Sequence, residues 1–197
     1  MKKNPIFERP DFKTWFGNSK IVDALGNPLR VYHSTDRDFT VFKNTKDIGF
    51  HFGTASHAKS RAIEKSYDRT LAFYLSIQNP IEMPDLGDWE FWRFIEDGMP
   101  RSSYINSHGV EAKGFTEHEI DHAAELLSLS SSDQEGWETM RRLFETKAFD
   151  GIRYKNIGET QGHTEGDYSY IAFRPNQVKT ALGRCHAYDR YSPDYSM

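Results

Sequence analysis

Alternating apolar and polar side chains mark a strand that ends in a polar loop near the start of the chain. Leu29, Val31 and His33 fall on one side of an extended segment, and the residues between them fall on the other. This period of two predicts a half-buried strand. The polar segment Ser34–Asp38 follows and predicts a loop. A histidine at the mouth of a strand, followed by two hydroxyl side chains, is a candidate for binding a sugar ring. A histidine satisfied by a backbone carbonyl is the alternative.

The same reasoning locates the other elements. In GFHFG (49–53), two phenylalanines alternate with His51 between glycines, and LAFYLSI (71–77) is the most strand-like run of the chain. A polar loop, long for a hairpin, separates the last two predicted strands and is a candidate functional loop. Strands are predicted at 21–23, 49–53, 71–77, 151–155 and 168–173, and helices at 11–16, 54–67, 89–96, 116–129 and 133–147.

Strands at both ends of the chain enclose a helical middle, which is typical of an α+β domain. We expect a single domain over residues 11–182 with a helical insertion at 85–147, and flexible tails at 1–10 and 187–197. Four apolar side chains recur at helical spacing in the last predicted helix and predict a face buried in the core: Trp137, Met140, Leu143 and Phe144.

Composition narrows the protein class. The 197 residues carry a formal net charge of −4, and their number suits one domain, with or without an insertion. The sequence contains no run of Lys or Arg of the kind that binds nucleic acid tightly and without sequence preference. A specific RNA is still an open alternative as a substrate. Cys185 is the single cysteine, which excludes an internal disulfide framework. Because MKKNPIFERP precedes no apolar run and no stretch reaches the length of a membrane span, we expect a cytoplasmic protein with no membrane partner.

The segment HEIDH (118–122) matches the H-E-x-x-H pattern. On a helix, His118 and His122 share a face, so both rings can bind one Zn²⁺ while Glu119 activates a water. Against this, a chain with 8 histidines and 29 acidic residues contains such a pattern by chance, and no third ligand is identifiable. Thr116 and Glu119 also form a capping-box signature. A zinc metallopeptidase is therefore kept as an alternative function.

Six segments, in order along the chain, carry a family resemblance: WFGNSKIVDALGNPLRVYHST (15–35), FTVF (39–42), GFHFGTASHAKSRA (49–62), LSIQNP (75–80), FDGIRYKNIGE (149–159) and SYIAFRPNQVKTA (169–181). Together they resemble the ADP-ribosyltransferases found in polyvalent proteins of phages and mobile elements, within the poly(ADP-ribose) polymerase-like superfamily. The resemblance implies an α+β fold of split, largely antiparallel sheets around a cleft for NAD⁺. It also implies transfer of ADP-ribose from NAD⁺, with loss of nicotinamide.

The implied reaction develops positive charge on a ribose as its bond to nicotinamide breaks, as in glycoside cleavage. Such a site needs a group that holds the ribose, a pocket for nicotinamide and a carboxylate near the developing charge. His33 matches the family histidine that hydrogen-bonds the nicotinamide ribose. The backbone of Ser34 matches the position that holds the carboxamide, where many relatives have glycine, and Thr35 matches an assisting hydroxyl.

The resemblance implies a nicotinamide pocket that departs from the family pattern. His51 stands where relatives usually have tyrosine, and Phe52 is its apolar partner, although a plain core role for Phe52 is equally compatible with the pattern. The aromatic residue that stacks on nicotinamide lies in the following helix of relatives. Alignment offers Ala62 at that position, so Tyr67 is the substitute candidate.

The catalytic carboxylate has several candidates. In polymerase-like members a glutamate lies two residues into the last motif strand, where this chain has Ser169, which cannot supply negative charge. Glu159, in YKNIGE, is the first candidate. Glu165 and Asp167, in EGD before the strand, are the others, and all three can instead be solvated loop acids.

From the resemblance we expect a mono-ADP-ribosyltransferase that uses NAD⁺ as substrate, requires no metal, and acts as a toxin or effector of a phage or mobile element. The acceptor is expected to be a protein or RNA in a bacterial or phage-infected cell. If the acceptor is water, the enzyme is an NAD⁺ glycohydrolase. An antitoxin or chaperone is a further possible partner, and the oligomeric state is open. A non-catalytic NAD⁺-binding module is the remaining alternative, since Ser169 and His51 depart from the family pattern.

Overall fold

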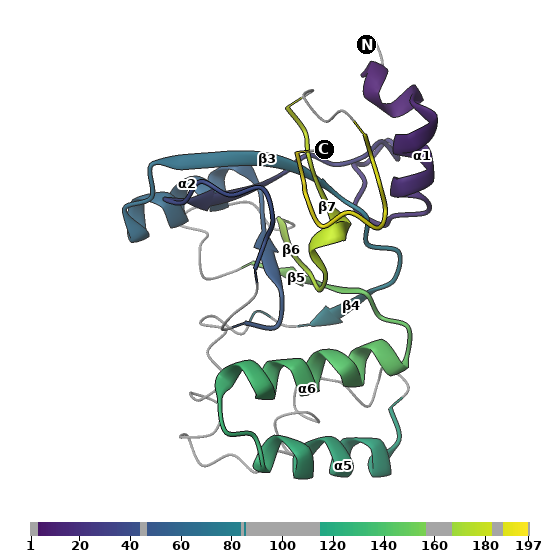
Figure 1. The fold of residues 1–197 in the computed structure, drawn as a ribbon, viewed down its shortest axis with the longest axis vertical. Helices are drawn as coiled ribbons and strands as arrows, with labels where there is room; N and C mark the ends of the chain where they lie inside the picture. Colours follow the sequence, from purple (N-terminus) through teal and green to yellow (C-terminus); the bar gives the residue numbers. More distant parts are fainter. Residues whose placement is uncertain are drawn as a thin grey trace.

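The computed structural model describes residues 4–43, 47–83, 85, 115–156, 167–182 and 187–196. Two sheets form its centre (Figure 1). The first has the antiparallel order β1 (Val31–Thr35), β3 (Arg69–Leu75), β7 (Val178–Thr180). The second has the order β2 (Phe50–Phe52), β6 (Tyr168–Ala172), β5 (Gly151–Lys155), β4 (Pro80–Met83), in which the β4–β5 pair is parallel. The expected α+β fold with split sheets is confirmed.

The two sheets meet where β1 approaches the end of β2. Tyr32 exchanges two backbone hydrogen bonds with Gly53, with N···O distances of 2.9 and 3.0 Å. A cluster of buried side chains joins the sheets behind this contact, including Val31 and Phe73 from one sheet and Phe52 from the other. Burial of this apolar surface holds the two sheets together at one edge.

The helix α2 (Ala55–Lys65) connects β2 to β3. Thr54 caps its first turn by accepting a hydrogen bond from the backbone N–H of His57. One face of α2 is buried at its start, where His57 and Ala58 are buried, whereas Ile63 near its end is 73% exposed. The helix therefore presents its first two turns to the rest of the fold.

The helical middle packs against the second sheet through its last helix. In Figure 1, α6 (Asp133–Thr146) lies between α5 (Glu117–Ser128) and the strands. The predicted apolar stripe is buried, and Phe144 stacks on Phe173 at 6.2 Å between ring centroids. The helix expected at 89–96 lies outside the described residues. Among the residues that are described, no helix has the length and apolar character needed to span a membrane.

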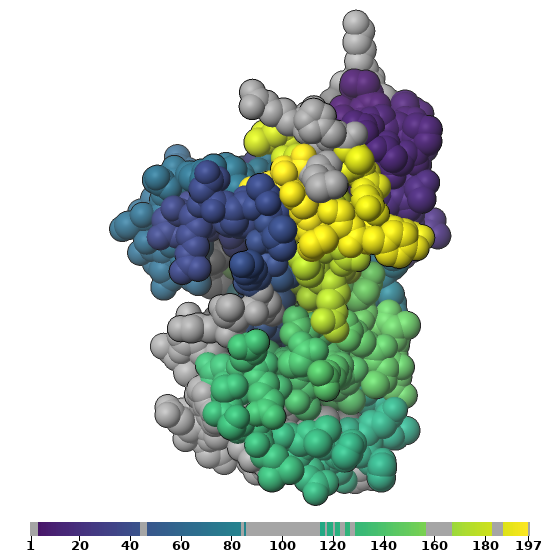
Figure 2. Space-filling view, in the orientation of Figure 1, coloured from purple at the N-terminus to yellow at the C-terminus, as the bar shows by residue number. Residues whose placement is uncertain are grey.

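The chain ends pack against the domain where flexible tails were expected. The 3₁₀ helix η1 (Pro5–Glu8) leads into α1 (Pro10–Phe16), whose Phe12 packs against Tyr188 with ring centroids 4.8 Å apart. Figure 2 shows the C-terminal residues in yellow against the purple N-terminal helix. The expectation overlooked the aromatic residues in both segments, which gain stability by burial.

The segment 187–196 is also tied to the loop after β1 and to β7. Tyr195 donates its hydroxyl proton to the Phe39 carbonyl, with 2.5 Å between the oxygens, and Thr180 N–H donates to the Tyr195 carbonyl at 2.9 Å. The fully buried Lys179 donates to the carbonyls of Ser192 and Asp194. Just before β7, the 3₁₀ helix η3 (Pro175–Gln177) ends the connection from β6.

Two local expectations differ from the structure. The strand predicted at 21–23 is only a single bridge between Val22 and Pro28. The strand β4 was not predicted, because Asn79-Pro80 is typical of a strand end. Proline is tolerated at the first position of an edge strand, and Pro80 occupies that position.

Candidate active site

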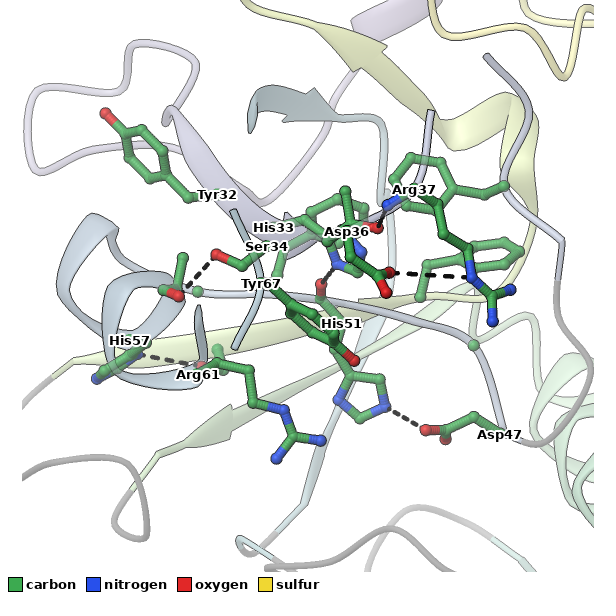
Figure 3. Close-up of a pocket in the computed structure, with 18 of the residues that line it drawn as sticks. Tyr32, His33, Ser34, Asp36, Arg37, Asp47, His51, His57, Arg61 and Tyr67 are labelled. Carbon is green, nitrogen blue, oxygen red and sulfur yellow. Dashed lines mark hydrogen bonds and ion pairs between the residues drawn. The ribbon is translucent and has the colours of Figure 1, made fainter. Parts of the chain in front are cut away.

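A cavity of about 860 Å³ lies where the two sheets meet, and residues of both sheets and α2 line it (Figure 3). Its volume lies within the usual range for ligand pockets, roughly 300–1,000 Å³. The described residues with expected site roles that line it are His33, Ser34, Thr35, His51, Phe52, Tyr67 and Ser169.

One ring nitrogen of His33 is fixed by the neighbouring strand. Nδ1 lies 2.9 Å from the His51 carbonyl oxygen. A carbonyl only accepts, so Nδ1 carries the proton and Nε2 is left as an acceptor. Burial lowers the pKa of His33 below its ordinary value, which favours this neutral ring. Phe42 and Phe52 pack against the ring at centroid distances of 5.3 and 5.7 Å. The site therefore presents an oriented hydrogen-bond acceptor.

The side chain and backbone of Ser34 have separate tasks. Its hydroxyl donates to the Ala58 carbonyl at 2.6 Å and pairs with the Thr70 hydroxyl at 2.8 Å, so it anchors α2 on the first sheet. Backbone groups alternate in direction along a strand. Because Tyr32 bonds to Gly53 rather than to β3, the N–H and C=O of Ser34 also point away from β3. This edge of β1 can bind a carboxamide.

Thr35 organises the loop that forms one wall of the cavity. Its side chain is buried, and Oγ1 accepts a hydrogen bond from the Arg37 N–H at 3.0 Å. The loop beyond it contributes Arg37 and Lys43 to the cavity lining. The hydroxyl of Thr35 thus shapes the loop in addition to lining the cavity.

His51 contacts an acidic side chain within the cavity. Its Nε2 lies 3.0 Å from Asp47 Oδ2, and both side chains are about a third exposed (Figure 3). Phe52, the next residue, is 2% exposed and belongs to the core that joins the sheets. The strand β2 therefore presents a polar ring to one face and an apolar ring to the core, as its alternation predicts.

A buried polar network lies at the ends of β5 and β6. Asn156 Nδ2 donates to Ser169 Oγ at 3.0 Å, and Ser169 Oγ lies 3.3 Å from His57 Nδ1. Ser169 is 2% exposed and lines the cavity, as its register in the last motif strand implies. The position thus carries a hydroxyl that is already hydrogen-bonded rather than a carboxylate.

The helix α2 and the turn after it supply the remaining wall. Tyr67 lines the cavity, and its N–H donates to the Ala62 carbonyl at 2.8 Å beyond the end of the helix. Arg61, one turn before the helix end, also lines the cavity and lies 3.5 Å from Glu64. Arg61 thus brings positive charge to the cavity from the side opposite Asp47 (Figure 3).

The candidate catalytic acids have different outcomes. Glu159 and Glu165 lie outside the described residues. Asp167 stands just before β6, where its carbonyl accepts from the Asn156 N–H at 3.2 Å, and its side chain is not part of the cavity lining. The described acids that do line the cavity are Asp36, Asp38, Asp47, Glu64 and Asp85.

Sequence reasoning assigned no role to several cavity residues. Asn156 belongs to the quoted motif YKNIGE, so its motif position was the available signal. His57 and Arg61 share one face of α2 at helical spacing, which a helical projection reveals. Nothing in the sequence pointed to Asp47, because its contact with His51 depends on how the chain between the two residues folds.

The residues of HEIDH do not converge on a metal site. Glu119 closes the predicted capping box, accepting from the Thr116 N–H at 2.8 Å, and it lies 2.8 Å from Lys147 Nζ. These partners lower the pKa of Glu119 to about 2. The His122 side chain is 62% exposed, and no group of three metal-ligating side chains occurs within the described ranges. The zinc alternative is therefore not favoured.

Comparison with known proteins adds a family match to this geometry. A model of the family described as ADP-ribosyltransferase in polyvalent proteins matches residues 23–186, which include β1, both cavity walls and the helical middle. Comparisons with curated proteins and with solved structures gave no significant match. The chain therefore belongs to the ADP-ribosyltransferases of polyvalent proteins.

Proposed function

We propose that this protein is a mono-ADP-ribosyltransferase that transfers ADP-ribose from NAD⁺ to a macromolecular acceptor and releases nicotinamide. The observation that carries this proposal is the arrangement of His33 and Ser34 on β1. His33 offers an oriented acceptor nitrogen, and the backbone of the next residue offers an open strand edge in the same cavity. A ribose hydroxyl and a neighbouring carboxamide need these two groups.

The chemistry requires no metal to activate the leaving group. The bond between C1′ of the ribose and the nicotinamide nitrogen breaks, and its electron pair neutralises the pyridinium. The ribose carries the resulting oxocarbenium-like charge until an acceptor oxygen or nitrogen forms the new bond and loses its proton to solvent. Residues accelerate this step only if they bind the transition state more tightly than the substrate. In this proposal, His33 and Ser34 hold the ribose and nicotinamide in the reactive orientation.

The rest of the cavity suits the remaining parts of NAD⁺. His51, Phe52 and Tyr67 supply the walls for the nicotinamide ring. Arg37 and Arg61 supply positive charge that suits a diphosphate.

For the catalytic carboxylate we propose Glu159, with Glu165 and Asp167 as the alternatives. The backbone bond between Asn156 and Asp167 closes the ends of the loop that carries both glutamates, and Asn156 lines the cavity. Glu159 follows Asn156 by three positions, a chain distance of at most about 11 Å. An acid within this reach can stabilise the positive charge that Ser169 cannot.

We propose a protein or RNA of a bacterial or phage-infected cell as the acceptor, and a role as a toxin or effector of a phage or mobile element. The family to which the chain belongs occurs in polyvalent proteins, which supports this setting. The net charge of −4 disfavours bulk nucleic acid as the acceptor and leaves a specific RNA or a protein. Transfer to water would make the protein an NAD⁺ glycohydrolase.

The first test is nicotinamide release from NAD⁺ by the purified protein in a bacterial lysate, with and without a chelator. Release that the chelator does not affect is expected. His33→Ala and Glu159→Gln are each expected to reduce release about 100-fold, in the range of a lost transition-state interaction. His118→Ala is the control and should retain full activity, because His118 is exposed and outside the cavity.

The outcomes separate the alternatives. Full activity of folded His33→Ala would remove His33 from the site. Activity of Glu159→Gln, together with loss in Glu165→Gln or Asp167→Asn, would move the acid role. Binding of NAD⁺ without any release would contradict the transferase and support a non-catalytic module. With NAD⁺ labelled in the ADP-ribose part, label that protease or RNase removes from lysate polymers identifies the acceptor class, whereas free ADP-ribose alone indicates hydrolysis.

A further inference from the structure

Ile48, two residues before β2, is packed against the helical middle. Ile48 is fully buried, in one core cluster with Trp137 and Phe144 of α6. The next residue, Gly49, has no room for a side chain, since a Cβ there would lie 2.4 Å from the Ala172 carbonyl oxygen. The chain that leads to the His51 wall of the cavity is therefore positioned by contacts on the side away from the cavity.

Arg141 of α6 binds this segment through its main chain. Its Nη1 lies 3.2 Å from the Ile48 carbonyl oxygen and 3.3 Å from the Phe173 carbonyl oxygen, and it donates to both. Its Nη2 pairs with Glu138 on the preceding turn of the same helix. The Arg141 side chain is only 7% exposed. A guanidinium is suited to this task because its planar fork binds several acceptors at once.

Hydrogen bonds continue from Ile48 into the cavity. The Ile48 N–H donates to Asp47 Oδ1 at 2.6 Å, and Asp47 Oδ2 lies 3.0 Å from His51 Nε2. The His51 carbonyl in turn accepts from His33 Nδ1 at 2.9 Å (Figure 3). Short polar contacts and the covalent structure of Ile48, Asp47 and His51 therefore connect the Arg141 guanidinium to the His33 ring.

We propose that Arg141 is a positioning residue for the donor site, which makes the helical middle part of the catalytic unit. It fixes Ile48, and through Asp47 and His51 it fixes the carbonyl that orients the His33 ring. The inference rests on the proposed function only for its effect on catalysis, since the coupling of the two rings to Arg141 is a property of the free protein.

The burial of Arg141 supports a positioning role over a role in stability alone. Replacement of a whole buried ion pair by apolar residues of similar volume is often neutral for stability. Met140 and Phe144, neighbours of Arg141 along α6, belong to a buried apolar cluster. What an apolar residue cannot do is hold the Ile48 carbonyl in place. A displacement of about 1 Å in a catalytic group can reduce turnover about 100-fold.

The test compares Arg141→Lys and Arg141→Met with Arg142→Met. Arg142 is a matched control because it is the next residue of α6 and also pairs with Glu138, at 3.3 Å, but is 75% exposed. In nicotinamide release, Arg141→Met is expected to lower kcat 10- to 100-fold while KM for NAD⁺ changes less than threefold, since the edge of β1 is retained. Arg141→Lys should recover part of kcat, and Arg142→Met should stay within twofold of the unmodified protein.

A second readout needs no activity. In the free protein, the ring-nitrogen NMR signals of His33 and His51 report their tautomers and hydrogen bonds. Both sets are expected to change in Arg141→Met and Arg141→Lys and to stay unchanged in Arg142→Met. Unchanged signals in folded Arg141 variants would overturn the proposal even if the enzyme is active. If the unmodified protein releases no nicotinamide but the His33 and His51 signals change in the Arg141 variants, the coupling is supported and the proposed function is contradicted.

Discussion

A main-chain carbonyl determines which nitrogen of the His33 ring carries the proton. A carbonyl can only accept a hydrogen bond, whereas many side chains can either donate or accept one. His51 supplies that carbonyl while its own ring pairs with Asp47. The geometry of His33 is thus independent of the protonation of any acid in direct contact with it. His33 itself is titratable, and its protonation would remove the acceptor at Nε2.

This arrangement predicts a pH dependence of activity. Burial lowers the pKa of His33, so the neutral ring persists below the ordinary histidine pKa of about 6.5. We expect kcat/KM to hold as the pH falls to 6.5, and to decline only at lower pH, where the ring gains a proton. The decline should follow the His33 titration measured by NMR, and a decline centred above pH 6.5 would contradict the neutral-ring assignment.

At the residue scale, the sequence predicted part of the cavity lining. His33, His51, Tyr67 and Ser169 were all expected at the site, and all line the cavity. Arg141 was not expected, because its acceptors are backbone carbonyls of residues distant in sequence. Every residue has such a carbonyl, so the residue types at those positions do not indicate the contact. Their roles in binding and catalysis stay predictions until the variants are measured.

At the scale of elements, α6 links the helical middle to the second sheet. Its apolar stripe was predicted from spacing alone, because a helix buries one face wherever it packs. The sheet order was not predictable, since strand neighbours depend on long-range pairing. The sequence also missed β4, an edge strand of four residues, because Asn79-Pro80 at its start is typical of a strand end.

The burial of α6 predicts a large loss of stability when a side chain of its apolar stripe is truncated. Phe144 is fully buried against Phe173, so Phe144→Ala is expected to lower the free energy of unfolding by about 3–5 kcal/mol. Leu129→Ala is the control, because Leu129 is 72% exposed and its change should stay within about 0.5 kcal/mol. Denaturant unfolding measures both, and equal losses would contradict the packing of α6 as core.

At the scale of the whole molecule, the C-terminal segment joins parts that are distant in sequence. Residues 187–196 contact α1, β7 and the cavity loop, and Tyr195 packs on Phe42 at 5.7 Å and on Phe73 at 5.0 Å between ring centroids. Phe42 in turn packs on His33. The segment therefore supports one wall of the site from outside.

Deleting residues 187–197 is expected to lower the melting temperature markedly. The deletion removes the Tyr195 ring and the two carbonyls that accept from buried Lys179. A buried charge that loses its partners costs about 3–5 kcal/mol. Lys179→Met in the shortened chain should recover part of the loss, because it removes that charge. If the shortened protein has the same melting temperature as the full chain, the segment adds no stability.

The parallel pairing of β4 with β5 constrains how this domain can vary or be shortened. Two parallel neighbours cannot be joined by a tight turn, because the chain leaves one strand at the end opposite to where it enters the next. Some return path of a dozen or more residues is obligatory there. The helical middle is that path, so it can be exchanged for another connection but not deleted outright. A minimal version of this domain would need a designed crossover that also replaces the hydrogen bond from Arg141 to the Ile48 carbonyl.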